Sequence, residues 1–512
     1  MNAIPTTFFS ILCSPLIIIT YFLFKYILLF TTLTFLCYYY ETYGMQKETH
    51  MALDNFQMEV VKTMQDLLVI AGPGSGKTTT IIAKVNYLLK TVLPKDILLL
   101  SFTNKSVEDI KKRINNQNIV VTTFHKLAID ILKYNNINYQ ICSSFLLDQI
   151  IDEYFKSLIF KEKNKLCRYL NILKLDFNSQ EYLSLKKLIK TFINLFKTNN
   201  HQIDRLYNMI KDYQDKYLIH LILTILKLYE EEKQSTNSYD FDDLITKATS
   251  FLKNKYNYHT FKYIIVDEFQ DTSLIRLELL KIIYYHSNSI ITAVGDDAQS
   301  IFHFSGCDLN IFLDFQKHFP KAKIMFLKNT YRNSQELINI SSDFINKNKL
   351  QIVKNMQSSL SISNPIEIIY YYNPIKSLKK LLKQLCINNN EIMILSRNKA
   401  DIYEYIDQDF SYNNDELIYQ DYHLKYLTIH SAKGLESQYV ILLNLSDKIY
   451  GMPNKIESHP ILKYAESKID SFPFAEERRV FFVALTRCKR KTFILVPRQA
   501  PSIFIKELKK QL

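Results

Sequence analysis

The segment Ala71-Gly-Pro-Gly-Ser-Gly-Lys-Thr78 decides the fold, because it stands between an apolar run at residues 67–70 and a helical pattern that continues to about residue 90. A glycine-rich turn between a strand and a helix surrounds phosphate groups with backbone N–H groups. Lys77 is therefore predicted to neutralise the β- and γ-phosphates of ATP, and Thr78 to offer its hydroxyl to Mg²⁺. Ala71 stands where the pattern usually has glycine, a permitted variant. The predicted nucleotide-binding residues of this segment are Ala71, Gly72, Pro73, Gly74, Ser75, Gly76, Lys77, Thr78 and Thr79.

A pair of acids supplies the second half of such a site. In Tyr263-Ile-Ile-Val-Asp-Glu268 the pair follows four strand-forming residues directly. Asp267 is predicted to hold Mg²⁺ through water, and Glu268 to orient and deprotonate the attacking water. The alternative is a solvated strand end, which the apolar run before the pair disfavours.

Short apolar runs that alternate with helical patterns predict a mostly parallel sheet covered by helices on both faces. The predicted strands cover residues 66–70, 97–102, 119–124, 263–266, 290–294, 324–327, 366–371, 391–395, 427–430, 440–443 and 492–496. Between residues 131 and 233 the pattern becomes helical, as the spacing of Leu147, Ile150, Tyr154 and Leu158 indicates. The predicted fold class is α/β, with two parallel-sheet lobes of the P-loop NTPase type and one all-helical insertion in the first lobe.

The predicted domains follow from these patterns. Residues 45–130 and 234–335 form the first, ATP-binding lobe, residues 131–233 the helical insertion, and residues 336–512 the second lobe. Residues 1–44 form an apolar N-terminal segment. Its stretch 8–40 exceeds the roughly 20 residues that cross a bilayer, and its one charge is Lys25. It is interpreted either as a transmembrane anchor or as an untranslated upstream region, with the start at Met45 or Met51.

The charge balance favours a polyanionic partner. Lys and Arg number 64 against 51 Asp and Glu, a net charge of +13, which is typical of nucleic-acid-binding proteins, although solvated lysines alone give the same excess. The seven cysteines contain no C-x-x-C pair, which argues against a zinc or iron–sulfur site and against a disulfide framework. An intracellular, reducing location is expected: the cytoplasm, the nucleus or a viral replication site.

Several further segments make the chain resemble the UvrD/Rep/PcrA group of superfamily 1 helicases. They are Asp54-Asn-Phe-Gln57, Ser101-Phe-Thr-Asn-Lys105, Thr122-Thr-Phe-His125, Tyr239-Asp-Phe-Asp-Asp-Leu244, Val294-Gly-Asp-Asp-Ala-Gln-Ser-Ile-Phe-His-Phe304, Asn329-Thr-Tyr-Arg332, Thr428-Ile-His-Ser-Ala-Lys-Gly-Leu-Glu436 and Glu476-Glu-Arg-Arg-Val-Phe-Phe-Val-Ala-Leu-Thr-Arg487. The resemblance runs from about residue 53 to residue 496, and it implies that both lobes are RecA-like. Agreement of so many segments in one order makes chance a negligible explanation.

The resemblance implies roles around ATP. Gln299 senses the γ-phosphate, and Arg332 and Arg487 reach it from the second lobe as arginine fingers. The implied catalytic residues are thus Lys77, Asp267, Glu268, Gln299, Arg332 and Arg487, with Thr78 and Asp267 at the metal. Gln57 reads adenine, Tyr331 stacks on it, Glu436 contacts the ribose, and Gly434 completes the nucleotide site. A surface salt bridge with Glu476 or Glu477 is the alternative for Arg487.

The resemblance also implies a DNA track, which needs phosphate donors and aromatic faces on which bases stack. The candidates are Phe102, Thr103, Asn104, Lys105, Thr123, His125, Phe302, Phe304, His430 and Lys433. An isolated aromatic residue more often belongs to the core. Motif position favours the DNA role for Phe302 and Phe304, and less strongly for Phe102.

Three departures from the family pattern matter. Thr79 replaces an arginine that clamps adenine, and Ser305 replaces an arginine linked to coupling. About thirty residues separate Arg397 from Thr428, where family members carry a second helical insertion that regulates unwinding. This chain is therefore predicted to be a compact form that lacks most of the second insertion.

The expected function is that of an ATP-dependent DNA helicase in replication, repair or recombination. By the resemblance it moves 3′ to 5′ on single-stranded DNA and acts at junctions of single and double strands, as a monomer or weak oligomer with accessory proteins. Three alternatives stay open. The chain is a single-strand-stimulated translocase that displaces proteins without efficient unwinding, a nucleotide-gated binding module with impaired turnover, or a membrane-tethered motor if residues 8–40 form an anchor.

Overall fold

The computed structural model describes residues 53–511 apart from 115, 117, 171–175, 202, 387–389, 456–458 and 467–469. The predicted anchor at residues 8–40 lies outside the described residues. Among the residues that are described, no helix is long and apolar enough to cross a membrane. The elements below belong to one unit, Asn55–Leu512.

The first sheet is parallel throughout, with the strand order β3-β2-β6-β7-β1-β8 among the described residues. Its strands are β1 (Leu67–Ala71), β2 (Ile97–Ser101), β3 (Val120–Thr123), β6 (Tyr263–Val266), β7 (Ile290–Gly295) and β8 (Lys323–Leu327). Because the strands run the same way, the segments that follow them all emerge at one edge of the sheet. The glycine-rich loop, the acidic pair and the segment with Gln299 follow β1, β6 and β7, so they meet there.

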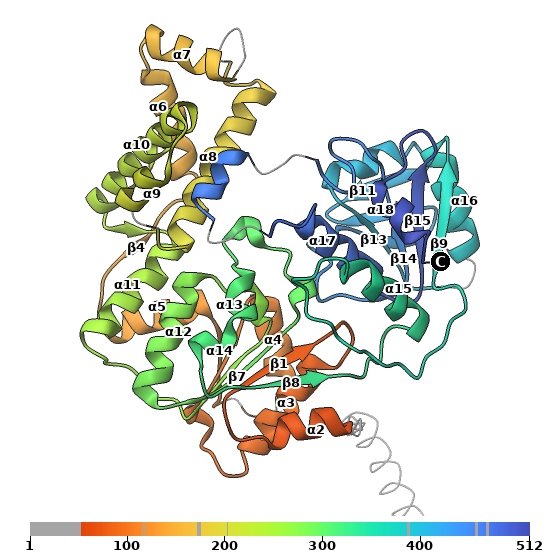
Figure 1. The fold of residues 1–512 in the computed structure, drawn as a ribbon, viewed down its shortest axis with the longest axis horizontal. Coiled ribbons are helices and arrows are strands. Elements are labelled where there is room, and N and C mark those ends of the chain that lie inside the picture. The colour runs from red at the N-terminus through yellow and green to blue at the C-terminus, as the bar shows by residue number, and fades with distance from the viewer. Residues whose placement is uncertain are drawn as a thin grey trace, which may run out of the picture. The chain divides into compact units, whose positions relative to one another are not determined.

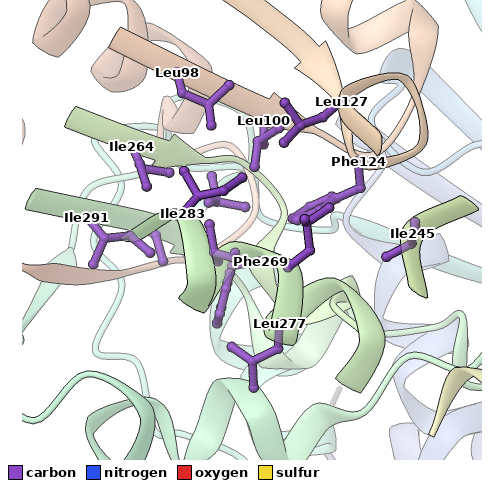
Figure 2. Packing of buried hydrophobic residues seen from close by; sticks show 14 of the residues in the cluster. Leu98, Leu100, Phe124, Leu127, Ile245, Ile264, Phe269, Leu277, Ile283 and Ile291 are labelled. Atoms are coloured by element: carbon purple, nitrogen blue, oxygen red, sulfur yellow. The ribbon is translucent and has the colours of Figure 1, made fainter. Parts of the chain in front are cut away.

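Alternation of side chains along the strands gives the first sheet two buried faces. Leu68 and Ile70 lie on one face, and Leu67 and Val69 lie on the other. The first face is covered by α5 (Phe124–Tyr134), α11 (Phe241–Asn254), α12 (Leu274–Ser287), α13 (Leu309–Leu313) and α14 (Phe315–His318). The second is covered by α2 (Asn55–Lys62), α3 (Lys77–Leu88) and α4 (Asn104–Arg113). Figure 2 shows side chains of the first face, with those of β2, β6 and β7 turned toward the covering helices.

The predicted insertion is a group of helices with its own core. They are α6 (Leu146–Ser157), α7 (Phe160–Leu170), α8 (Gln180–Thr198), α9 (Ile203–Met209) and α10 (Tyr213–Ser235). The chain enters and leaves the group through two short parallel strands, β4 (Gln140–Ile141) and β5 (Ser238–Tyr239). Ile131 and Leu132, at the predicted domain boundary, lie on α5 and pack in the core of the first lobe. In the structure the helical core therefore begins after α5.

The second sheet has the order β11-β12-β13-β10-β14-β15-β9 within the described chain. Its strands are β9 (Ile366–Tyr371), β10 (Ile392–Ser396), β11 (Phe410–Asn413), β12 (Glu416–Tyr419), β13 (Tyr422–Thr428), β14 (Ser437–Leu442) and β15 (Cys488–Pro497). The helices α15 (Gln335–Ile345), α17 (Ala475–Leu485) and α18 (Ile503–Leu508) pack on one face, and α16 (Pro374–Cys386) packs on the other. The α/β prediction with two parallel-sheet lobes is confirmed.

A β-hairpin stands where the second helical insertion was expected to be missing. After the 3-10 helix η5 (Lys399–Glu404), β11 and β12 pair antiparallel with each other, and β12 pairs antiparallel with β13. These two strands were not predicted. Leu417 and Tyr419 of β12 are buried and alternate with less buried side chains, whereas no side chain of β11 is buried. The short segment therefore extends the second sheet at its edge.

One segment from the C-terminal part of the chain packs into the helical core. Ile461, Leu462, Tyr464 and Ala465, in and next to the 3-10 helix η6 (Pro460–Tyr464), belong to the same buried cluster as α8 and α10. Figure 1 shows this segment, in blue, beside α8. The hydroxyl of Tyr464 donates to Asp215 at 2.9 Å. The helical group is thus in contact with sequence that lies between β14 and α17.

Candidate active site and nucleic-acid interface

The glycine-rich loop is shaped by left-handed backbone at two glycines. Gly74 has φ 69° and Gly76 has φ 76°, a conformation that side chains disfavour. A Cβ at Gly74 would lie 2.5 Å from Arg332 Cβ, and one at Gly76 would lie 2.6 Å from Gln57 Nε2. Gln57 also donates to the Ser75 carbonyl at 3.1 Å. The loop therefore requires glycine at both positions, and the predicted adenine reader lies directly against it.

The acidic pair faces the loop lysine. Nζ of Lys77 lies 3.6 Å from Oε1 of Glu268, and Gln270 Nε2 donates to Oε2 of Glu268 at 2.6 Å. Burial and the neighbouring Glu268 raise the pKa of Asp267. Burial alone would raise the pKa of Glu268 as well, but Lys77 and Lys433 lower it to about 2. Glu268 is thus the carboxylate that carries the negative charge.

Gln299 of the first lobe and Arg487 of the second lobe are hydrogen-bonded to each other. Gln299 ends the 3-10 helix η3 (Asp297–Gln299) after β7, and Arg487 follows α17 of the second lobe. Nη2 of Arg487 donates to Oε1 of Gln299 at 3.2 Å, and Nε donates to the Val483 carbonyl at 3.0 Å. Arg487 is 1% exposed, so it is not the surface arginine of the alternative interpretation. The acid Glu477 pairs with Arg397 instead, at 2.8 Å.

Arg332 and Tyr331 lie next to the glycine-rich loop. The N–H of Tyr331 donates to the Gly74 carbonyl at 2.9 Å, and its ring is 44% exposed. Nε of Arg332 donates to Oε2 of Glu436 at 2.6 Å. The predicted arginine finger, Arg332, is therefore ion-paired with Glu436, the residue predicted to contact the ribose. Thr79, in the place of the adenine-clamping arginine, accepts from Nη2 of Arg113 at 3.3 Å.

The residues present fit a nucleotide with Mg²⁺. The glycine-rich loop offers the N-terminus of α3 and a lysine, which is a ready anion site. No cluster of three or more His, Cys, Asp or Glu side chains suited to a metal occurs among the described residues. Mg²⁺ in such sites takes one or two protein oxygens and completes its shell with phosphates and water. Thr78 and Asp267 would supply that number.

Three rings form a partly exposed aromatic cluster. The ring centroids of Phe302 and Phe304 lie 6.0 Å apart, and those of Phe304 and His430 lie 5.8 Å apart. Phe304 is 53% exposed. It also borders a groove of about 600 Å³ whose remaining lining comes from α6 and α8 and includes three lysines, Lys186, Lys187 and Lys190. Burial, with Arg397 and Lys433, lowers the pKa of His430 to about 4, so the ring is neutral at pH 7.

A second set of predicted DNA contacts follows β2 and β3. Thr103 and Asn104 are exposed at the start of α4. The guanidinium carbon of Arg276 lies 5.2 Å from the centroid of the Phe102 ring. The ring centroids of His125 and Phe241 lie 5.4 Å apart, and Phe241 is 56% exposed. Sequence reasoning missed Arg276 and Phe241. Phe241 lies inside the quoted segment 239–244, where its aromatic type was the signal. Arg276 had no such signal.

Two predicted DNA donors have other partners in the structure. Nζ of Lys433 lies 2.5 Å from Asp271 and donates to the Gln299 carbonyl at 2.7 Å. The hydroxyl of Thr123 caps α5 by accepting from the N–H of Lys126 at 3.3 Å. Both groups are thus engaged in structural contacts, and Lys433 connects the segment after β13 to the segments after β6 and β7. Their DNA-binding role stays a prediction.

The two sheets and the groups that meet between them define a two-lobed P-loop NTPase. Comparison with known proteins specifies the class further. The profile of the UvrD/REP helicase N-terminal domain matches residues 53–320, and that of the UvrD-like helicase C-terminal domain matches residues 406–499. The chain belongs to the UvrD/REP helicase family.

Individual relatives agree with this assignment. The chain is 27% identical to DNA helicase IV of Escherichia coli over 479 residues, covering 88% of this chain and 69% of that protein. It is 30% identical to the ATP-dependent DNA helicase Rep of Buchnera aphidicola over 382 residues, covering 69% and 54%. It is 28% identical to the ATP-dependent DNA helicase PcrA of Staphylococcus epidermidis over 333 residues, covering 62% and 43%. The chain thus spans about half the length of Rep and PcrA.

Proposed function

We propose that this chain is an ATP-dependent DNA helicase that moves 3′ to 5′ on single-stranded DNA and separates duplex ahead of it. The observation that carries the proposal is the hydrogen bond between Arg487 and Gln299, because it joins the γ-phosphate sensor of the first lobe to a cation of the second. A family member with such a pair has a means to tie ATP to the relative position of its lobes. The direction of movement comes from the family resemblance.

The chemistry assigned to this site is hydrolysis of the terminal phosphate of ATP. Lys77 and the loop amides would bind the phosphates, and Glu268 would orient and deprotonate the attacking water. Mg²⁺, held by Thr78 and Asp267, would neutralise charge on the β- and γ-phosphates. Arg332 and Arg487 would add positive charge where negative charge develops. Arg487 follows α17 of the second lobe, whereas Arg332 follows β8 of the first sheet and lies beside the glycine-rich loop. Completion of the site by Arg487 would therefore depend on the relative position of the two lobes.

The DNA track is proposed to run over the aromatic cluster of Phe302, Phe304 and His430 and on toward Phe102 and His125. Base stacking on aromatic rings tolerates every sequence, as a motor requires. The neutral His430 suits stacking better than phosphate pairing. The groove beside Phe304, with its lysines, continues the track toward the helical group.

The decisive experiment measures ATP hydrolysis with and without single-stranded DNA, and then strand separation on duplexes with 3′ or 5′ tails. We expect hydrolysis to rise with single-stranded DNA and unwinding to occur from 3′ tails. Lys77→Ala is the inactive control, because it removes the phosphate-binding cation. A rate of ATP hydrolysis that does not change when single-stranded DNA is added would contradict the proposed motor function. Unwinding from 5′ tails alone would contradict the direction.

A second candidate is a translocase that displaces proteins without efficient unwinding. The hairpin β11–β12 favours it, because it occupies the place of the insertion that regulates unwinding in the family. DNA-stimulated hydrolysis and displacement of a bound protein, with no strand separation from either tail, would select this candidate.

Phe304→Ala is expected to weaken binding of single-stranded DNA by roughly 5- to 150-fold, because one base loses about 1–3 kcal/mol of stacking. Fluorescence anisotropy with a labelled oligonucleotide measures the change. Tyr285→Ala is the matched control, since Tyr285 is 58% exposed on α12 and lies near the start of β7, at the other edge of the sheet. Equal affinities for both variants would remove Phe304 from the track.

A further inference from the structure

Lys354 is a nearly buried cation outside every motif described above. Its side chain is 11% exposed, and Nζ lies 2.9 Å from Oδ1 of Asp296 and 2.5 Å from Oδ1 of Asp297. Both aspartate side chains are fully buried. Two adjacent carboxylates in one buried site are not both ionised without a compensating charge. Lys354 supplies that charge.

Asp296 in turn fixes the side chain of Gln299. Oδ2 of Asp296 accepts from Nε2 of Gln299 at 2.6 Å, and Oδ1 accepts from the N–H of Ala298 at 3.1 Å. An ionised carboxylate only accepts hydrogen bonds, so the amide NH₂ must face it and the amide oxygen must point away. On that other side the oxygen accepts from Arg487 at 3.2 Å.

Loss of the charge on Asp296 would remove this constraint. A protonated Asp296 could donate to Gln299 as well as accept from it, so only the hydrogen bond from Arg487 would then fix the orientation of the amide. Burial alone would raise the pKa of Asp296, but the charges of Lys354 and Lys77 lower it. Burial, with Asp296 next to it, raises the pKa of Asp297 despite Lys354. The arrangement thus keeps Asp296 as the ionised member of the pair.

The segment that carries Lys354 is held against the first lobe. The N–H of Ile352 donates to Oδ2 of Asp297 at 2.8 Å, and the N–H of Gln357 donates to the Lys328 carbonyl at 2.7 Å. Met356 packs on the glycine-rich loop, with Sδ 3.0 Å from the position that a Cβ of Gly72 would take. These contacts fix the lysine relative to both the phosphate loop and Asp296.

We infer that Lys354 is a positioning residue of the ATP site, which keeps the Gln299 amide turned toward Arg487 and the γ-phosphate by compensating Asp296 and Asp297. The inference rests on the proposed ATPase function and deepens it. Lys354 acts through Asp296, so its effect should appear only where Gln299 is present.

The test compares Lys354→Met, Gln299→Ala and the double variant. We expect Lys354→Met to lower kcat for ATP at least about tenfold and to raise KM by a smaller factor, because the contact with the γ-phosphate is stronger in the transition state than in the bound ground state. The double variant should be no more than about twofold slower than Gln299→Ala. The preference for ATP over ADP in equilibrium binding should fall at least about fivefold, and this readout does not depend on turnover.

Lys349→Met is the control, since Lys349 is exposed a few residues earlier, and it should match the wild type. If Lys354→Met does not fold, Lys354→Gln removes the charge, retains a donor and must show the same changes. A kcat within twofold of wild type, or effects that multiply in the double variant, would overturn the inference. A wild type that binds ATP but does not hydrolyse it would contradict the ATPase proposal alone. The role of Lys354 would then be tested by the preference for ATP over ADP in equilibrium binding. If Lys354→Met left that preference unchanged, the inferred role of Lys354 would be overturned.

Discussion

Glu268→Gln is expected to lower kcat for ATP hydrolysis by about 10²–10⁴-fold, the range for loss of a general base, while ATP binding persists. Gln has nearly the same shape, so Gln270 and the segment around η2 (Phe269–Asp271) retain a partner. Lys77, 3.6 Å from Glu268, remains available to the phosphates. Single-turnover hydrolysis and binding of a fluorescent ATP analogue measure the two effects separately.

The contrast with Lys77→Ala makes this result specific. That variant removes the phosphate-binding cation, so it should lose nucleotide affinity as well as turnover. Glu232→Gln on α10 is the control, because Glu232 is exposed in the helical group. If Glu268→Gln retained kcat within about threefold of wild type, another group would have to activate the water. Asp267 is the nearest alternative, since it is the adjacent carboxylate after β6.

Much of the fold could be predicted because its signals are local. Each central strand of the first sheet is four to six residues long and mostly apolar, and each active-site segment follows such a strand directly. Parallel pairing then brings those segments to one edge without further information. The positions of Lys77, Asp267 and Glu268 could be expected on this basis alone.

The contacts that the sequence did not predict depend on residues far apart in the chain. Lys354 pairs with Asp296 across more than fifty residues and has no spacing pattern. Ile461 is apolar, but nothing near it in the sequence says that it packs into the core of α8 and α10. Lys433 was assigned to DNA from its motif, whereas its ammonium group meets Asp271. In each case the partner is set by tertiary packing.

Two further contacts connect the segment after β7 to other parts of the molecule. A Cβ at Gly306, which follows η4 (His303–Ser305), would lie 2.0 Å from Oγ1 of Thr198 on α8. Nε2 of His303 lies 3.3 Å from Glu466, just beyond η6. The segment that carries Phe302 and Phe304 therefore packs against both the helical group and the η6 region. Displacement of the second lobe would be transmitted to the proposed DNA track through these contacts.

Arg487→Ala is expected to lower kcat by about 10³-fold or more, the range for loss of an arginine finger. Burial, with the nearby Arg332, lowers the pKa of Arg487 to about 9, so it is charged at pH 7. Its removal also leaves the amide oxygen of Gln299 without this donor. Steady-state hydrolysis with saturating single-stranded DNA gives kcat and KM, and thermal unfolding tests whether the protein is intact.

Arg487→Lys separates the charge from its geometry. A lysine places one charge near Gln299 but cannot also span to the Val483 and Leu435 carbonyls as the guanidinium does. We expect it to recover only a small part of the lost rate. Arg490→Ala, an exposed arginine three residues later, should behave as wild type. Arg487→Ala could instead retain the wild-type rate of ATP hydrolysis measured without DNA and lose only the stimulation by single-stranded DNA. Arg487 would then act in coupling between the lobes, and Arg332 would be the remaining candidate for the finger that reaches the γ-phosphate.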